Sequence, residues 1–163
     1  MKLLVVCLGN ICRSPLAEGA LRSRIQHSAL AGKVDVDSAG TGGWHVGHPP
    51  DLRAIDCARR HGVDIGMLRG RQLELGDFEH FDWVLCADAQ NLRDVLQLAP
   101  LHARHKVALL MEWAGVEGSS SIPDPYTGDS AHFERVWRMV DAAAQGVVDR
   151  LCEGRDSGII RTS

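Results

Sequence analysis

Residues 3–15 read LLVVCLGNICRSP, and this stretch decides the fold. Leu3–Cys7 is a short, continuous apolar run of the kind that forms a strand buried on both faces. Gly9 and Asn10 follow it, and both residue types tolerate the unusual backbone angles of a tight loop. Ser14 is a suitable N-cap for a helix. The stretch therefore predicts a strand, a tight loop and a helix start in direct succession.

The rest of the chain repeats the alternation of short apolar runs and helical patterns. Strands that alternate with helices favour parallel pairing through right-handed crossovers. We therefore expect a small three-layer α/β domain of the flavodoxin-like type. Its four-stranded parallel sheet has helices on both faces and a tight loop after the first strand. The predicted strands are 3–7, 34–38, 82–87 and 106–111, and the predicted helices are about 14–26, 51–61, 89–98 and 130–152.

Composition and charge fit a single globular domain. The chain has 163 residues, 45% hydrophobic and 24% charged, with a net charge of −3. We expect one domain over residues 1–153 and a polar, frayed tail over 154–163. The charge balance argues against a nucleic-acid partner, and no apolar run reaches the length of a membrane span. Since the first apolar run is also too short for a signal peptide, we expect a cytoplasmic protein.

The loop after the first strand carries the residue types of a phosphate site. Its backbone N–H groups lead into a helix N-terminus, an arrangement that binds anions and favours the thiolate form of Cys7. Arg13 lies six residues later, and its planar guanidinium can bind two phosphate oxygens. Ser14 can donate a hydrogen bond to the sulfur. The expected phosphate-binding residues are Leu8, Gly9, Asn10, Ile11, Cys12, Arg13 and Ser14.

The segment from Val6 to Pro15 resembles the signature loop of the low-molecular-weight protein tyrosine phosphatase family. The resemblance implies metal-free and cofactor-free hydrolysis of phosphotyrosine through a phosphocysteine on Cys7. It also implies that Asp124 protonates the leaving oxygen and then activates water. The resemblance extends in order through Asp37-Ser38-Ala39-Gly40-Thr41, Pro49-Pro50-Asp51, Arg59-Arg60-His61-Gly62, Arg71-Gln72-Leu73, Asn91-Leu92-Arg93 and Asp124-Pro125-Tyr126.

The same resemblance implies a deep slot that selects phosphotyrosine over the shorter phosphoserine. For Trp44, partial burial in the core is the alternative. Cys12 is either a small packing residue or, as the resemblance implies, the partner of a reversible disulfide with Cys7 under peroxide. The implied partner is a phosphotyrosine-containing protein, with the enzyme a monomer or weak dimer. The residues expected to wall the slot are Leu8, Ile11, Trp44 and Tyr126.

The match departs from the family pattern in two places. The family has a His near Leu68 that is hydrogen-bonded toward the loop Asn, and this chain has none there. Asn10 must therefore be held differently, and Ser38 and Ser14 are the candidates. Thr127 stands where some members carry a second aromatic residue, which opens the rim of the slot.

The remaining cysteines and histidines give no clear sign of a metal site. Cys57 and Cys86 lie in apolar patterns and are expected to be core residues. His45 and His48 flank the loop around Trp44, but no further ligand cluster completes a site nearby. We therefore expect no metal.

Four alternatives stay open. An arsenate reductase of the same fold would need two further redox cysteines near the third strand, where Cys86 stands alone. In a protein arginine phosphatase the residue corresponding to Ile11 is Thr. An inactive phosphate- or phosphopeptide-binding module would be favoured if Cys7, Arg13 or Asp124 were replaced. A small redox protein would use Cys7 and Cys12, but their spacing differs from the usual redox motif.

Overall fold

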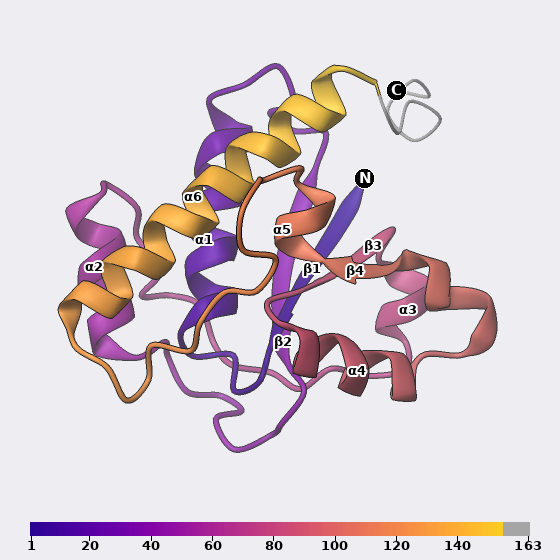
Figure 1. Ribbon diagram of the computed structural model, residues 1–163, viewed down its shortest axis with the longest axis horizontal. Coiled ribbons are helices and arrows are strands. Elements are labelled where there is room, and N and C mark those ends of the chain that lie inside the picture. Colours follow the sequence, from indigo (N-terminus) through magenta and orange to yellow (C-terminus); the bar gives the residue numbers. More distant parts are fainter. Residues whose placement is uncertain (155–163) are drawn as a thin grey trace.

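The computed structural model describes residues 1–154 and shows a parallel sheet between two layers of helices (Figure 1). The strand order is β2-β1-β3-β4, and every pair is parallel. This confirms the predicted three-layer α/β fold. The strands are β1 Lys2–Cys7, β2 Asp35–Gly40, β3 Trp83–Cys86 and β4 Val107–Leu109.

The two faces of the sheet carry separate hydrophobic cores. Alternate residues of β1 point to opposite faces, so Leu3 and Val5 enter one core while Leu4 and Val6 enter the other. The first core is covered by α1 Arg13–Gln26, α2 Leu52–Arg60, α5 Leu110–Trp113 and α6 Ser130–Cys152. The second is covered by α3 Asp77–His80, α4 Ala89–Leu98 and the 3₁₀ turn Leu101–Lys106.

The last helix, α6, packs directly on the first, α1 (Figure 1). Its Phe133 and Trp137 are buried, as expected for a core stripe. Asp129 caps its first turn and forms a capping box with His132. Arg24 of α1 pairs with Asp141 of α6 at 2.8 Å. Elements from opposite ends of the chain therefore build one layer.

Three local predictions were wrong or missing. Ser14 does not cap α1, which begins at Arg13 after Cys12 and has no side-chain cap, because the Ser14 hydroxyl faces Cys7 instead. The fourth strand ends at Leu109, and the next apolar residues form α5. A buried apolar run has no period that separates strand from helix. The short α3 and the 3₁₀ turn were not predicted.

No helix within residues 1–154 is both long enough and apolar enough to cross a membrane. Of the tail predicted for 154–163, residues 155–163 lie outside the described part of the chain.

Candidate active site

Asn10 fixes the loop between β1 and α1. Its φ angle of 57° is left-handed, and its side chain is buried. The side-chain amide donates to Ser14 Oγ at 2.7 Å and to Ser38 Oγ at 3.0 Å, which confirms the two predicted partners. A third contact was not predicted: the backbone N–H of Arg71 donates to Asn10 Oδ1 at 3.0 Å. The loop is therefore held from three separate segments.

A buried carboxylate extends this network. Ser38 Oγ donates to Glu18 Oε1 at 2.7 Å, and Arg22 lies 2.7 Å from the other Glu18 oxygen. Burial raises the pKa of Glu18 despite the hydrogen bond from Ser38 and the nearby charge of Arg22. Because the Ser38 hydroxyl donates its hydrogen to Glu18, its oxygen acts only as an acceptor for the amide of Asn10.

Cys7 ends the central strand and points into the loop. Its sulfur lies 3.0 Å from Ser14 Oγ. Since Ser14 already accepts a hydrogen bond from Asn10, its own hydrogen is available to the sulfur. Gly40 at the end of β2 comes so close that an added Cβ would stand 2.8 Å from the Leu8 carbonyl oxygen. The neighbouring strand thus packs tightly against the loop.

Arg13 is a buried cation with a fixed orientation. Its Nη1 donates to Asp88 Oδ2 at 2.6 Å and to the Ile122 carbonyl at 3.0 Å. Although burial acts to raise the pKa of Asp88, hydrogen bonds from Arg13 and from backbone N–H groups hold it below its usual value. Sequence reasoning missed Asp88. The available signal was its place directly after a predicted strand, at the sheet edge where Cys7 lies.

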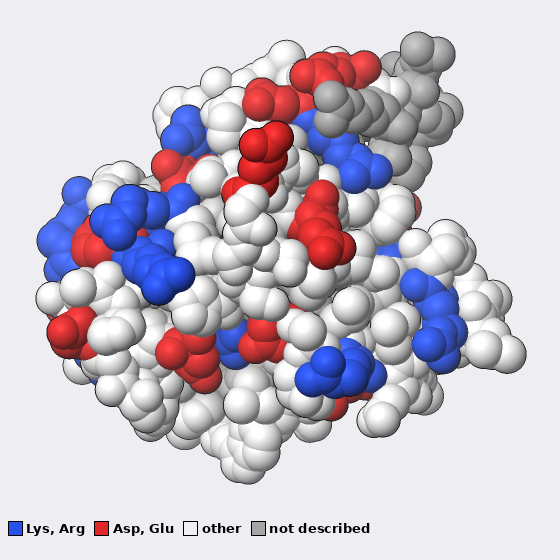
Figure 2. All heavy atoms as spheres, viewed as in Figure 1, with Lys and Arg blue, Asp and Glu red and all other residues white. Residues whose placement is uncertain are grey.

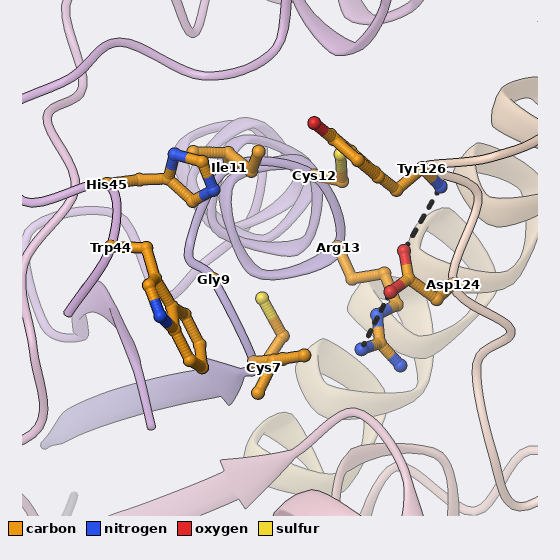
Figure 3. A pocket seen from close by; sticks show the side chains of 10 residues that line it. Cys7, Gly9, Ile11, Cys12, Arg13, Trp44, His45, Asp124 and Tyr126 are labelled. Atoms are coloured by element: carbon orange, nitrogen blue, oxygen red, sulfur yellow. Dashed lines mark hydrogen bonds and ion pairs between the residues drawn. The ribbon is translucent and has the colours of Figure 1, made fainter. Parts of the chain in front are cut away.

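Asp124 reaches the same place from the loop before α6. Its Oδ2 lies 3.9 Å from Arg13 Nη2, and its Oδ1 accepts from the backbone N–H of Tyr126 at 3.1 Å (Figure 3). Its side chain is 48% exposed, against 4% for Arg13. A half-exposed carboxylate therefore stands at the mouth of a site whose guanidinium is buried.

Cys7, Arg13 and Asp124 line one cavity of about 200 Å³. A cavity of about 150 Å³ holds benzene, so this volume suits an aryl ring together with a small polar group. Trp44 is 69% exposed and forms one wall, which rules out its burial in the core (Figure 3). His45 also lines the cavity and was missed, although it neighbours Trp44. The lining residues are Cys7, Leu8, Gly9, Ile11, Cys12, Arg13, Trp44, His45, Asp124 and Tyr126.

Cys12, Cys57 and Cys86 are buried. Burial raises the pKa of Cys12, which shares the cavity with Cys7. Burial also raises the pKa of Cys57 to about 11 and that of Cys86 to about 12. Cys57 and Cys86 are core residues, as predicted, and neither lines the cavity. A cysteine relay of the arsenate reductase type therefore finds no support in their placement.

A second polar cluster lies where α2 meets α6. Cys57, His61 and Glu134 place possible ligand atoms within 4.8 Å of one another. Glu134 Oε1 already accepts from Arg60 Nε and Nη2, at 3.1 and 2.9 Å, and Oε2 lies 2.8 Å from His61 Nε2. Basic and acidic side chains are interspersed at this end of the molecule (Figure 2). Because the Arg60 guanidinium already neutralises Glu134, we interpret the cluster as a network of ion pairs between α2 and α6 and not as a metal site.

Comparison with known proteins gives one consistent family. The family described as "Low molecular weight phosphotyrosine protein phosphatase" matches residues 2–156. A relative of that description from Schizosaccharomyces pombe is 40% identical over 134 residues, which cover 82% of this chain and 85% of the relative.

Two solved structures are similar throughout. A protein tyrosine phosphatase from Entamoeba histolytica, with Hepes in the active site, has a TM-score of 0.90 and 34% identity, and covers 95% of this chain and 99% of its own. Vibrio vulnificus Wzb in complex with benzylphosphonate has a TM-score of 0.80 and 32% identity, and covers 91% of this chain and 97% of its own.

Proposed function

The chain belongs to the low molecular weight phosphotyrosine protein phosphatase family, and on this premise we propose how its residues hydrolyse phosphotyrosine. Members of the family are phosphoric monoester hydrolases. In the proposal Cys7 is the nucleophile, Arg13 binds the phosphoryl oxygens and Asp124 is the general acid and base. The observation that carries the proposal is that Cys7 and Arg13, from the two ends of one loop, and Asp124, from a distant loop before α6, line one cavity.

In the first step the Cys7 thiolate attacks phosphorus, and the bond from phosphorus to the tyrosine oxygen breaks. Protonated Asp124 gives its proton to that oxygen, so tyrosine leaves neutral. The backbone N–H groups of the loop and the Arg13 guanidinium bind the phosphoryl oxygens, where negative charge is held in the transition state. Asp88 keeps Arg13 in that orientation.

In the second step the ionised Asp124 takes a proton from water, and the water oxygen attacks phosphorus. The phosphorus–sulfur bond breaks, the thiolate returns and inorganic phosphate leaves. The hydrogen bond from Ser14 stabilises sulfur as it recovers its charge. Both steps use the same carboxylate, which stands at the mouth of the cavity where it can meet the leaving group and then water.

The cavity supports an aryl phosphate as the substrate class. Ile11, Trp44 and Tyr126 line it with apolar surface, and its volume accommodates one ring. The benzylphosphonate bound to Vibrio vulnificus Wzb combines the same two chemical parts, a ring and a phosphoryl group. We propose phosphotyrosine-containing proteins as substrates. We further propose a cytoplasmic location, since all five cysteines are unpaired.

The decisive experiment is hydrolysis of para-nitrophenyl phosphate and of a phosphotyrosine peptide in EDTA under reducing conditions. Wild type is expected to turn over both. Cys7→Ser is expected to lose turnover and to keep binding inorganic phosphate, because the loop N–H groups and Arg13 remain. Residual turnover by Cys7→Ser near the wild-type level would exclude Cys7 as the nucleophile. An inactive wild type that binds phosphate would support a binding module instead.

A further inference from the structure

The loop that carries Asp124 is held on its outer side by an arginine from α2. Arg53 Nη2 donates to the Tyr126 carbonyl at 2.8 Å, and Arg53 Nη1 donates to the Gly128 carbonyl at 3.1 Å. On the inner side, Arg13 donates to the Ile122 carbonyl at 3.0 Å. Asp124 therefore lies between two guanidinium anchors, one before it and one after it in sequence.

Arg53 is itself fixed to the residue that precedes its helix. Asp51 accepts from Arg53 Nε and Nη2, each at 3.0 Å, and also caps the helix by accepting from the Arg53 backbone N–H at 2.9 Å. The hydrogen bond from Arg53 holds the pKa of Asp51 below its usual value. The carboxylate is thus ionised at neutral pH and orients the guanidinium.

Asp51 also contacts the phosphate loop, the segment from Cys7 to Ser14 between β1 and α1. The Asp51 backbone N–H donates to the Ile11 carbonyl at 2.9 Å. The contacts therefore run without a break from Ile11 through Asp51 and Arg53 to Tyr126, and from Tyr126 N–H to Asp124 Oδ1. In this way the nucleophile's loop and the acid's loop share a common support.

The guanidinium also lies over aromatic rings, which limits its freedom to swing away. Its central carbon is 4.7 Å from the centre of the Phe133 ring and 5.8 Å from that of Tyr126. Phe133 is fully buried at the start of α6 and cannot follow a moving loop. Arg53 is therefore bound to a fixed ring as well as to a fixed carboxylate.

We propose that Arg53, oriented by Asp51, is a positioning residue that holds Asp124 at the distance from the phosphate loop at which it can transfer protons. The inference rests on the proposed function, because it assigns Arg53 an effect only through Asp124. Arg53 touches neither substrate nor phosphate in this scheme. Its loss should therefore weaken acid catalysis and leave phosphate binding intact.

The test measures kcat/KM for a series of aryl phosphates whose leaving phenols differ in pKa. Arg53→Ala is expected to lower kcat/KM about tenfold for phenyl phosphate and little for para-nitrophenyl phosphate, since poor leaving groups need the proton most. Asp124→Ala is expected to show the same pattern more strongly. Adding Arg53→Ala to Asp124→Ala should then cause no further loss, because the acid through which Arg53 acts is already gone.

Three controls keep the test decisive. Arg59→Ala removes an exposed arginine from the same helix and should leave every rate unchanged. Arg53→Lys keeps one cation and should recover part of the rate, which guards against poor folding of the alanine variant. The dissociation constant of inorganic phosphate should stay at the wild-type value in Arg53→Ala.

Equal slowing of all aryl phosphates in Arg53→Ala would overturn the inference, and so would a further loss in the Asp124→Ala background. Normal rates in Arg53→Ala would also overturn it while leaving the proposed function standing, provided that Asp124→Ala is slow. An inactive wild type would instead remove the proposed function itself.

Discussion

The phosphate loop, which joins β1 to α1 and runs from Cys7 to Ser14, and the acid loop, which carries Asp124 before α6, are held in different ways. In the phosphate loop Asn10, Arg13 and Ser14 are at most 4% exposed, and buried side chains hold the backbone in one conformation. In the acid loop Asp124 and Tyr126 are about half exposed, and the hold comes from arginines of other elements. Groups that bind the charged phosphoryl oxygens must be fixed in advance, which burial achieves. A proton donor must contact first the substrate and then water, which requires partial exposure.

Arg13 belongs to both regions, so its replacement should give the largest effect. Arg13→Lys is expected to lower kcat/KM for aryl phosphates by about 10³-fold. A lysine cannot bind two phosphoryl oxygens in a plane while it also donates to Asp88 and the Ile122 carbonyl. Steady-state kinetics would measure the loss in kcat/KM, and a phosphate titration would measure the loss in binding. A loss below tenfold would show that the two regions do not depend on this shared guanidinium.

Asp124→Ala should separate the two regions. It is expected to lower kcat for phenyl phosphate about 10²-fold, the usual size of a general acid's contribution. Phosphate affinity should stay within a few-fold of wild type, because the buried loop does not need the carboxylate. A calorimetric titration with phosphate serves as the control. If affinity fell as far as kcat, the regions would not be independent.

Asn10 tests the phosphate loop alone. Asn10→Gly keeps the left-handed backbone but leaves Ser14, Ser38 and the Arg71 N–H without their partner, so kcat/KM should fall about tenfold. Asn10→Ala should lose the same activity and be less stable than Asn10→Gly by about 1 kcal/mol, since alanine is strained at this φ. Urea unfolding of the two variants would measure the difference. Equal stabilities would mean that the loop backbone relaxes.

Glu18 gives the smallest expected effect, and its sign follows from burial. The folded-state pKa is raised above the usual 4.5. The stability that this carboxyl contributes is therefore complete below about pH 4.5 and is lost as pH rises through the folded-state pKa. Glu18→Gln cannot ionise and still accepts from Ser38. The melting temperature of Glu18→Gln minus that of wild type should increase by a few degrees between pH 4.5 and pH 7. A difference that stays constant over this range would contradict the prediction.

Sequence patterns predicted the fold and the phosphate loop more fully than the supports around them. The bounds of α4 and α6 follow from caps and helical spacing, which are local properties. The two hydroxyl partners of Asn10 were expected from the resemblance to the family, because this chain lacks the family's His near Leu68. Asp88 and Arg53 were not predicted as supports because their partners lie on other elements, and which side chains meet is decided by lateral packing. Local patterns contain no such information.

The packing of α6 on α1 has a consequence for synthesis on the ribosome. The first helix is complete by Gln26, but the helix that covers it begins only at Ser130. At about 5–20 residues per second, that interval lasts on the order of ten seconds. During this time the apolar side chains of α1, such as Leu21, are not yet packed against α6. The phosphate loop of the nascent chain is therefore attached to a helix whose core is incomplete.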